Sequence, residues 1–304
     1  MNTSRPRYSV VVPTFQRADS LTRCLDALAA QTLERDRFEV VVVDDGSREP
    51  PRAVVARATG SLDVRLIEQR NAGPASARNA GARAARGEYV VFTDDDCRPD
   101  PRWLRTIDVT AARYPGCAIG GRVVNALGDG LCSTASQLLI EFLYDYYNVE
   151  ETGGRFFITS NLALPLESFH RIGGFDVSFP LAAAEDRDLC DRWREAGLAM
   201  VYSEDAIVHH AHTLGLRSFC RQHFNYGCGA FHLHRARARR GEQPLRVEPP
   251  NFYGRLVSYP LGRADAPRAV ALSALMALSQ AVYVTGYFTE RVRSRVPASA
   301  FARA

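Results

Sequence analysis

The stretch E-Y-V-V-F-T-D-D-D-C-R-P-D-P-R-W spans residues 88–103 and joins a run of β-forming residues to three consecutive carboxylates. The apolar run at residues 89–93, followed by turn-forming residues, predicts a buried strand. In open α/β sheets, ligands bind just beyond the carboxyl ends of the strands. We therefore expect the chemistry of this protein at Asp94, Asp95 and Asp96.

The three carboxylates repel one another, so a cation would favour their gathering at one strand end. Alternate residues of an extended segment point the same way, so Asp94 and Asp96 are expected to share one target while Asp95 faces the other way. Hard oxygen ligands suit Mg²⁺ or Mn²⁺ held jointly with substrate phosphates. By itself the triplet leaves a solvated acidic turn or a helix N-cap cluster open.

Composition bounds the class of protein. A chain of 304 residues with 46% apolar residues suits one large domain, or one domain with an appendage. All the basic residues are arginine, which excludes a Schiff-base lysine or a P-loop. Seven scattered cysteines without a C-x-x-C pair, and no signal-peptide pattern before the first predicted strand, predict reduced thiols in a cytoplasmic protein. The net charge of +4, without a basic arm, predicts no nucleic-acid partner.

Strand and helix patterns alternate along the first hundred residues, which predicts a parallel sheet with helices on both faces and a nucleotide-binding half. A dinucleotide dehydrogenase would need G-x-G-x-x-G after the first strand, where residues 13–18 read P-T-F-Q-R-A. The predicted strands are residues 8–12, 38–43, 64–67 and 89–93, and the predicted helices are residues 20–30, 52–58 and 75–86.

A second acidic pair, Asp44 and Asp45, ends the second predicted strand. An acid at this position suits the ribose or base of a nucleotide. The alternative is an ordinary turn before Gly46.

Five motifs, in order along the chain, resemble the family 2 glycosyltransferases with the GT-A fold. The resemblance covers roughly residues 8–230. The motifs are V-V-V-P-T-F-Q-R (10–17), V-V-V-D-D-G-S (41–47), N-A-G-P-A-S-A-R-N-A-G (71–81), F-T-D-D-D (92–96), and G-G-F-D-x-x-F-P followed by E-D-R-D-L (173–189).

The resemblance implies an α/β fold of the GT-A type, a Rossmann-like, mostly parallel sheet with helices on both faces. Residues 1–234 are expected to form the catalytic domain, with a nucleotide-binding half at about 1–100 and an acceptor half at about 101–234. Residues 235–304 are expected to add an Arg/Pro-rich linker and an apolar C-terminal helix.

The implied reaction is inverting transfer of a sugar from a nucleotide-sugar donor, with a UDP-sugar favoured, to a hydroxyl acceptor. It uses Mn²⁺ or Mg²⁺ and an aspartate base, and serves polysaccharide, glycolipid or other glycoconjugate synthesis. The resemblance assigns Pro13, Thr14, Asp44, Asp45, Arg78, Asp94 and Asp95 to the donor, Asp94, Asp96 and His210 to the metal, Asp186 to catalysis as the base, and Glu185, Gly174 and Asn161 to the acceptor side.

Physical reasons support the base. Asp186 opens a predicted amphipathic helix, and a helix N-terminus favours an ionised carboxylate. The alternative is that Glu185, Asp186 and Asp188 merely decorate the first helical turn. Asn161 either faces a sugar or bonds to the backbone.

The histidines at 209, 210 and 212 follow the predicted helix that Asp186 opens. Neighbouring residues of a strand point to opposite sides, so only one of His209 and His210 can reach the metal. We favour His210, with His212 on its face. Arg217 or Arg221 is expected either to touch the diphosphate or to belong to a plain amphipathic helix.

Residues 269–288 carry no charge and are long enough to cross a bilayer, although serine, glutamine and threonine dilute the segment. Docking on a membrane surface, a homodimer helix and a true span remain open, in that order, beside a helix packed on the catalytic domain. Membrane contact would place the protein at the inner face of the membrane. Two rival functions are a nucleotidyltransferase of similar fold and a catalytically inactive, sugar-nucleotide-binding scaffold.

Overall fold

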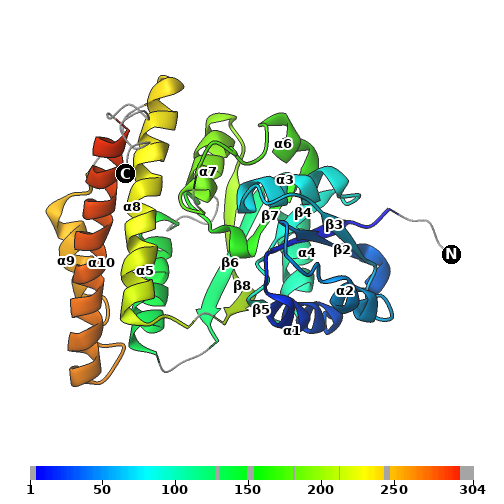
Figure 1. Cartoon of the computed structure of the whole chain (residues 1–304), viewed down its shortest axis with the longest axis horizontal. Coiled ribbons are helices and arrows are strands. Elements are labelled where there is room, and N and C mark those ends of the chain that lie inside the picture. The colour runs from blue at the N-terminus through cyan, green and yellow to red at the C-terminus, as the bar shows by residue number, and fades with distance from the viewer. Residues whose placement is uncertain are drawn as a thin grey trace. The chain divides into compact units, whose positions relative to one another are not determined.

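An eight-stranded sheet with strand order β3-β2-β1-β4-β7-β6-β8-β5 forms the core of one part of the protein (Figure 1). The computed structural model describes residues 5–126, 130–148, 154–180, 182–211, 213–242 and 247–294. The chain divides into two compact units. The sheet unit comprises Met1–Leu127, Tyr144–Ser178 and Asp186–His212, and the helical unit comprises Gly128–Leu143, Phe179–Glu185 and Thr213–Ala304.

The first half of the sheet is parallel, as the alternating pattern predicts. Strand β1 pairs in parallel with β2 and β4, and β2 pairs in parallel with β3. Strand β1 continues two residues beyond the predicted end, through Pro13, so that Thr14 lies opposite Asp44. The elements are β1 (Tyr8–Thr14), α1 (Ala18–Ala29), η1 (Arg35–Arg37), β2 (Phe38–Asp44), α2 (Arg52–Ala58), β3 (Val64–Glu68), α3 (Pro74–Ala84) and β4 (Tyr89–Phe92).

The second half of the sheet contains the described strands that run against the others. Strand β7 is antiparallel to β4 and β6, and β5 is antiparallel to β8, whereas β6 and β8 are parallel. The sheet is therefore mostly parallel, as predicted. The elements are β5 (Cys97–Pro99), α4 (Trp103–Arg113), β6 (Ala118–Asn125), η2 (Thr159–Asn161), β7 (Leu162–Pro165), α6 (Leu166–Arg171), α7 (Glu185–Glu195) and β8 (Met200–His210).

Helices cover both faces of the sheet. Side chains alternate along each strand, so each strand presents side chains to the helices on both faces. Val10 and Val12 belong to a core cluster with residues of α1 and α4. Val11 points the other way, towards α3, where a Cβ at Gly81 would come within 2.4 Å of the Val11 side chain. Apolar side chains on both faces explain why these strands read as continuous valine runs.

The helical unit contains most of α5 (Leu131–Tyr147) together with α8 (Leu216–Arg239), α9 (Pro250–Ser258) and α10 (Ala266–Arg293). Helices α8 and α10 run parallel, since Cys228 Sγ contacts the Gly286 carbonyl at 3.5 Å and His232 Nε2 lies 3.1 Å from Glu290 Oε1. Glycines allow the close approach. A Cβ at Gly227 would lie 1.9 Å from the Tyr283 carbonyl oxygen.

Helix α8 runs through residues 234 and 235, where the sequence predicted a domain boundary and a linker. Arg235, Arg237 and Arg239 form its last turns, because arginine and the intervening alanines are strong helix formers. Of the places where the chain passes from one compact unit to the other, the last lies between residues 212 and 213. Helix α9, which the sequence analysis did not predict, begins at Pro250.

Helix α10 is long and apolar enough to cross a membrane by length and composition alone. It packs along α8, however, and the Glu290–His232 contact joins the two helices. A span by α10 in this arrangement would carry the charged helix α8, including Arg217 and Arg221, into the hydrocarbon, at a high free-energy cost. The packing within the helical unit therefore disfavours a span.

Candidate active site

The ends of strands β1, β2 and β4 bring the predicted donor-binding residues to one edge of the sheet. Thr14 ends β1 and Asp44 ends β2, and the two are direct neighbours in the register. The Thr14 hydroxyl donates a 2.7 Å hydrogen bond to Asp95 Oδ2, just beyond β4. Pro13 is the residue before Thr14 and lies within β1. These contacts link the first strand to the carboxylate triplet.

The three carboxylates have three different sets of partners. Asp94 Oδ1 accepts a 2.8 Å bond from Arg78 Nη2. Arg17 Nη1 lies 3.2 Å from Asp95 Oδ1 and 2.9 Å from Asp96 Oδ2. Among these contacts, Asp96 shares Arg17 with Asp95, whereas Asp94 pairs with Arg78; a cation shared by Asp94 and Asp96 stays a prediction. Residues 95 and 96 form a turn, so the two-residue alternation of a strand does not apply.

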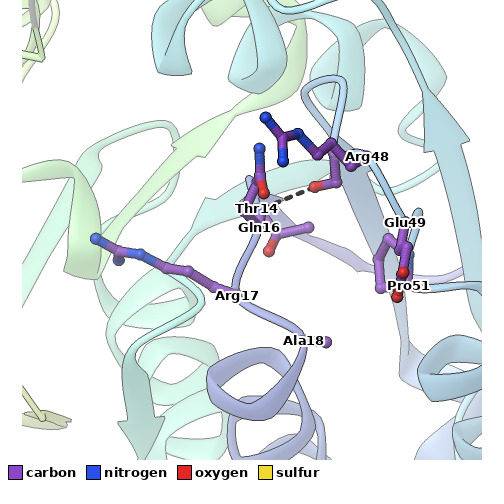
Figure 2. A pocket seen from close by; sticks show the side chains of 8 residues that line it. Thr14, Gln16, Arg17, Ala18, Arg48, Glu49 and Pro51 are labelled. Atoms are coloured by element: carbon purple, nitrogen blue, oxygen red, sulfur yellow. Dashed lines mark hydrogen bonds between the residues drawn. The ribbon is translucent and has the colours of Figure 1, made fainter.

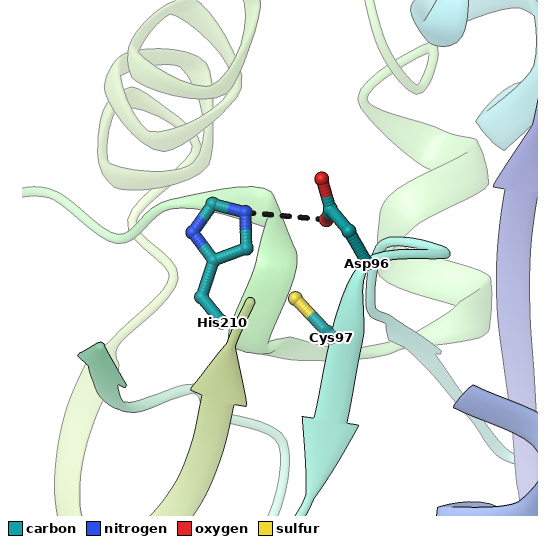
Figure 3. Close-up of side chains that lie close together, drawn as sticks. All are labelled: Asp96, Cys97 and His210. Carbon is teal, nitrogen blue, oxygen red and sulfur yellow. Dashed lines mark ion pairs between the residues drawn. The ribbon is translucent and has the colours of Figure 1, made fainter. Parts of the chain in front are cut away.

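Pairing of β5 with β8 brings His210 to the triplet. His210 lies directly opposite Cys97, and its Nε2 lies 3.2 Å from Asp96 Oδ1 (Figure 3). The Ala211 N–H donates to the Asp96 carbonyl at 2.9 Å and holds the two strand ends together. His209 lies opposite Arg98, one residue out of phase with His210. His212 lies outside the described residues.

Electrostatics at this point favour a cation. Burial lowers the pKa of His210, but its hydrogen bond to Asp96 and the charges of Asp96 and Asp94 outweigh burial, so the pKa is raised. Burial raises the pKa of Asp95 to about 6, against the opposing effects of Thr14 and Arg17. The positive charge of Arg17 offsets part of the negative charge of Asp95 and Asp96.

The donor set at Asp96 and His210 fits a divalent cation. A carboxylate oxygen and an imidazole nitrogen meet there from two different strands, and both are ordinary ligands of Mn²⁺. Asp94, the third predicted ligand, pairs with Arg78 at 2.8 Å, and its role at the metal stays a prediction. With so few protein ligands, such an ion keeps coordination positions for water or phosphate oxygens.

The two acids after β2 differ in what they contact. The Asp45 carboxylate accepts bonds from Gln69 Nε2 at 2.7 Å, Ala72 N at 2.9 Å and Gly73 N at 2.8 Å. It thereby fixes the loop that leads into α3. Asp44 is 1% exposed, and its Oδ1 has no hydrogen-bond partner among the described residues. Asp44 therefore offers an unused acceptor at the strand end.

A pocket of about 260 Å³ lies between the segments that follow β1 and β2 (Figure 2). Gln16, on its wall, has a φ of 56°, an uncommon conformation for a residue other than glycine. The Gln16 N–H donates to Ser47 Oγ at 2.7 Å, which helps to hold it there. The pocket is lined by Thr14, Gln16, Arg17, Ala18, Ser47, Arg48, Glu49 and Pro51.

The Gly-Gly-Phe loop, residues 173–175, is joined to α3. Asn79 donates to the Phe175 carbonyl at 2.8 Å and accepts from the Phe175 N–H at 2.9 Å. Gly174 has a φ of 66°, and a Cβ there would meet Asn79 Oδ1 at 2.6 Å. The Arg78 guanidinium lies 5.8 Å from the centre of the Phe175 ring. The loop thus supports the arginine that contacts Asp94.

Helix α7 positions the predicted base. Glu185 opens the helix and Asp186 follows it, after Ala184 with a φ of 71°. The Arg187 N–H donates to Asp186 Oδ1 at 2.7 Å, which orients the carboxylate. Arg192, one turn and a half further on, donates to the carbonyls of Ile172 and Gly174 at 2.8 and 2.7 Å. The same helix is therefore bonded to the Gly-Gly-Phe loop.

Asn161 is engaged by the fold. Its Oδ1 accepts from Trp103 Nε1 at 2.8 Å, and its Nδ2 donates to the carbonyls of Arg122 and Ala206 at 2.9 and 2.8 Å. It is 1% exposed. Asn161 was predicted either to face a sugar or to bond to the backbone, and its two bonds to backbone carbonyls match the second role. These bonds account for its buried position without a sugar contact. Arg217 and Arg221 lie on α8, in the helical unit.

Two residues of the site, Arg17 and Cys97, are not among those predicted from the sequence. Arg17 lies three residues after Thr14, in the same motif, and Cys97 directly follows the triplet. Their positions next to motif residues could have indicated a role in the site. Their contacts, Arg17 with Asp95 and Cys97 with His210, depend on long-range pairing and could not be predicted locally.

The fold and the geometry of the strand ends define a GT-A type α/β protein. A family model, "Glycosyl transferase family 2", matches residues 9–173, more than half of the chain. The chain belongs to glycosyl transferase family 2.

Curated relatives agree. Validoxylamine A glucosyltransferase of Streptomyces hygroscopicus subsp. jinggangensis is 31% identical over 230 residues, which cover 66% of this chain and 54% of that protein. Glycosyltransferase AglE of Haloferax volcanii is 27% identical over 233 residues, covering 75% of this chain and 74% of that protein. The match thus spans about half the length of the first relative.

Solved structures support the fold. The mannosyltransferase PcManGT from Pyrobaculum calidifontis, in complex with GDP-Man and Mn²⁺, has a TM-score of 0.62 at 23% identity and covers 99% of this chain and 79% of that one. S. aureus TarS in complex with UDP-GlcNAc has a TM-score of 0.54 at 19% identity, covering 95% and 91%. The predicted GT-A fold is confirmed.

Proposed function

We propose that this protein transfers a sugar, with inversion, from a nucleotide-sugar donor to a hydroxyl acceptor. The observation that carries the proposal is the convergence of Thr14, Arg78, the triplet at residues 94–96 and His210 beyond the strand ends. Arg17 and Arg78 place two positive charges beside the three carboxylates, and Asp96 and His210 provide a candidate metal position. Such a group suits a diphosphate that is held through a cation.

The nucleotide is assigned to the ends of β1 and β2. The unused Asp44 Oδ1 suits a ring N–H of a nucleobase, which a buried carboxylate accepts strongly. Uracil, thymine and guanine all offer such an N–H, so this contact leaves the donor class open; we favour a UDP-sugar. Among the related structures, PcManGT holds GDP-Man and TarS holds UDP-GlcNAc.

Asp96 and His210 would hold the Mn²⁺ or Mg²⁺ ion, which neutralises charge on the leaving diphosphate when bound. Arg78 contacts Asp94 and is close enough to the triplet to fix the donor phosphates beside it. Arg17 contacts two of the three carboxylates and would exchange them in part for phosphate oxygens.

Asp186 is proposed as the base. Its carboxylate takes the proton of the acceptor hydroxyl while the hydroxyl oxygen bonds to the anomeric carbon and the bond from that carbon to the diphosphate breaks. Attack opposite the leaving group inverts the anomeric centre. The bond from the Arg187 N–H fixes one Asp186 oxygen, and the other oxygen is proposed to accept the proton. Glu185 and Gly174 would border the acceptor.

We also propose the kind of acceptor and product, and where the protein acts. The acceptor is a glycan, a lipid-linked or a small-molecule hydroxyl, and the product belongs to a polysaccharide, glycolipid or other glycoconjugate. We propose a cytoplasmic location. The exposed apolar residues of α10, such as Val270, Val284 and Phe288, support either contact with the inner face of the membrane or homodimer formation.

The experiment that tests inversion follows the anomeric configuration. An α-linked nucleotide sugar is incubated with the protein, Mn²⁺ and an acceptor, and the product is examined by ¹H NMR. A β-linked product supports the proposal, and an α-linked product contradicts inversion. A scaffold would form no product, and a nucleotidyltransferase would instead make the nucleotide sugar from a sugar phosphate and a nucleoside triphosphate.

A further inference from the structure

The thiol of Cys97 lies beside the proposed metal ligands. Cys97 and His210 are directly opposed in the β5–β8 ladder, so their side chains share one face of the sheet. Ligand atoms of Asp96, Cys97 and His210 all lie within 4.8 Å of one another. Figure 3 shows the sulfur, the imidazole and the carboxylate around one space.

The Cys97 sulfur lies at the buried, inner end of this space. Cys97 is 0% exposed and belongs to the apolar core of the sheet unit, whereas the side chains of Asp96 and His210 are 16% and 28% exposed. A cation would enter past Asp96 and His210 and meet the sulfur last. This depth allows one inner sulfur ligand and leaves the outer side open for water or phosphate.

The three side chains are held by paired backbone, which favours a preformed site. The Ala211 N–H donates to the Asp96 carbonyl at 2.9 Å, and the Ala126 N–H donates to the His210 carbonyl at 3.0 Å. Strand β8 is thereby bonded on both sides next to His210. Small rotations of side chains, rather than a change of fold, would bring the three ligand atoms onto one ion.

We propose that Cys97 is a third metal ligand, so that this site takes thiophilic divalent cations such as Zn²⁺ as well as Mn²⁺ or Mg²⁺. Cysteine sulfur, histidine nitrogen and aspartate oxygen are all Zn²⁺ ligands, and three protein ligands with a fourth, open position is the usual arrangement of a catalytic Zn²⁺ site. On binding, the S–H bond of Cys97 breaks, its proton goes to solvent and a metal–thiolate bond forms. The inference rests on the proposed metal site only through Asp96 and His210, and does not depend on sugar transfer.

A regulatory consequence follows for the proposed enzyme. Divalent affinity for such ligands rises from Mn²⁺ to Zn²⁺, and a thiolate increases the preference. Zn²⁺ would therefore displace Mn²⁺ from Asp96 and His210 and inhibit transfer. A site with only oxygen and nitrogen ligands would discriminate less strongly between Zn²⁺ and Mn²⁺.

Co²⁺ titration of the full chain tests the sulfur ligand. Co²⁺ bound through thiolate gives an intense near-ultraviolet charge-transfer band, which oxygen and nitrogen ligands do not. The wild type should show this band at one equivalent, and Cys97→Ser should lose it. The matched control Cys117→Ser, which changes a cysteine outside the cluster, should keep the band. Zn²⁺ affinity of Cys97→Ser should fall at least about tenfold to a hundredfold, the loss that removing even an outer-shell partner causes.

X-ray absorption on the Zn²⁺-loaded wild type needs no variant and removes any doubt about folding of Cys97→Ser. One sulfur at about 2.3 Å beside nitrogen and oxygen ligands supports the proposal. Only nitrogen and oxygen ligands, a band that survives in Cys97→Ser, or no Zn²⁺ binding would each overturn it. Mn²⁺-dependent nucleotide binding is measured in parallel. If it persists while the sulfur is absent, only this inference fails; if it is also absent, the proposed function fails too.

Discussion

Arg17 Nη1 lies 2.9 Å from Asp96 Oδ2, on the carboxylate that is proposed to hold the metal. The arginine and a divalent cation would therefore compete for Asp96. Their competition links the loop after β1, which borders the pocket, to the metal position after β4.

Replacing Arg17 should strengthen metal binding in the absence of nucleotide. Two unit charges about 4 Å apart in water-like surroundings interact by about 1 kcal/mol, so the interaction of Arg17 with a doubly charged ion is about 2 kcal/mol, and Arg17→Gln should raise Mn²⁺ affinity about thirtyfold. Calorimetric titration with Mn²⁺ measures this. Arg23→Gln, on the helix that follows Arg17 and bonded to Ser20, is the matched control. Unchanged or weaker Mn²⁺ binding in Arg17→Gln would contradict the competition.

Asp44→Asn should weaken nucleotide binding. A hydrogen bond to a charged group is worth about 1.5–3 kcal/mol, which corresponds to a loss of roughly tenfold or more in affinity. The affinity for ribose 5-phosphate, which lacks the base, should be unchanged in the same variant. Equal losses for the nucleotide and for ribose 5-phosphate would mean that Asp44 does not contact the base.

Asp186→Asn should abolish transfer and leave donor binding nearly intact, because the base does not hold the nucleotide. Loss of a general base lowers kcat by about 10²–10⁴-fold. Product formation and nucleotide affinity are measured on the same preparation. Glu195→Gln, an exposed position at the other end of α7, should retain both. Weakened nucleotide binding in Asp186→Asn would show that the base is misassigned.

Acid should destabilise the protein through His223. This side chain is 1% exposed, and burial lowers its pKa to about 4. Above about pH 6.5, the usual pKa of histidine, neither the folded nor the unfolded state binds a proton there. As the pH falls towards 4, only the unfolded chain takes up the proton, so stability declines, by about 2 kcal/mol between pH 7 and pH 5.

Urea unfolding at pH 7 and pH 5 measures this decline. His223→Phe should remove most of the difference between the two pH values, whereas His170→Phe, at an exposed position, should preserve it. An equal pH dependence in wild type and His223→Phe would show that another group carries the acid sensitivity.

Local patterns predicted the first half of the sheet well. Valine runs and their spacing are enough to predict parallel strands, and the acidic ends of β2 and β4 follow from register alone. The antiparallel return of β5 onto β8 could not be predicted, because strand pairing over a long separation leaves no local trace. The contact of His210 with Asp96 follows from that pairing, although the order of the motifs suggested it.

Other differences have local causes. The triplet was treated as an extended segment beyond the strand at 89–93, but a turn at residues 95 and 96 redirects the carboxylates. The arginines at 235–239 were read as a linker, although alanine and arginine favour a helix in any sequence. Asn161 could be read as a sugar contact because its partner Trp103 lies far away in the sequence.

The most direct test of the account is calorimetric titration of UDP, GDP and dTDP into the purified protein, with Mn²⁺ and then with EDTA. The account predicts that one nucleotide binds tightly with Mn²⁺, that EDTA weakens its binding, and that Asp96→Asn binds it with Mn²⁺ only as weakly as the wild type does in EDTA. Binding that is equally tight in EDTA, or no binding of any nucleotide to the folded protein, would contradict the metal-dependent donor site.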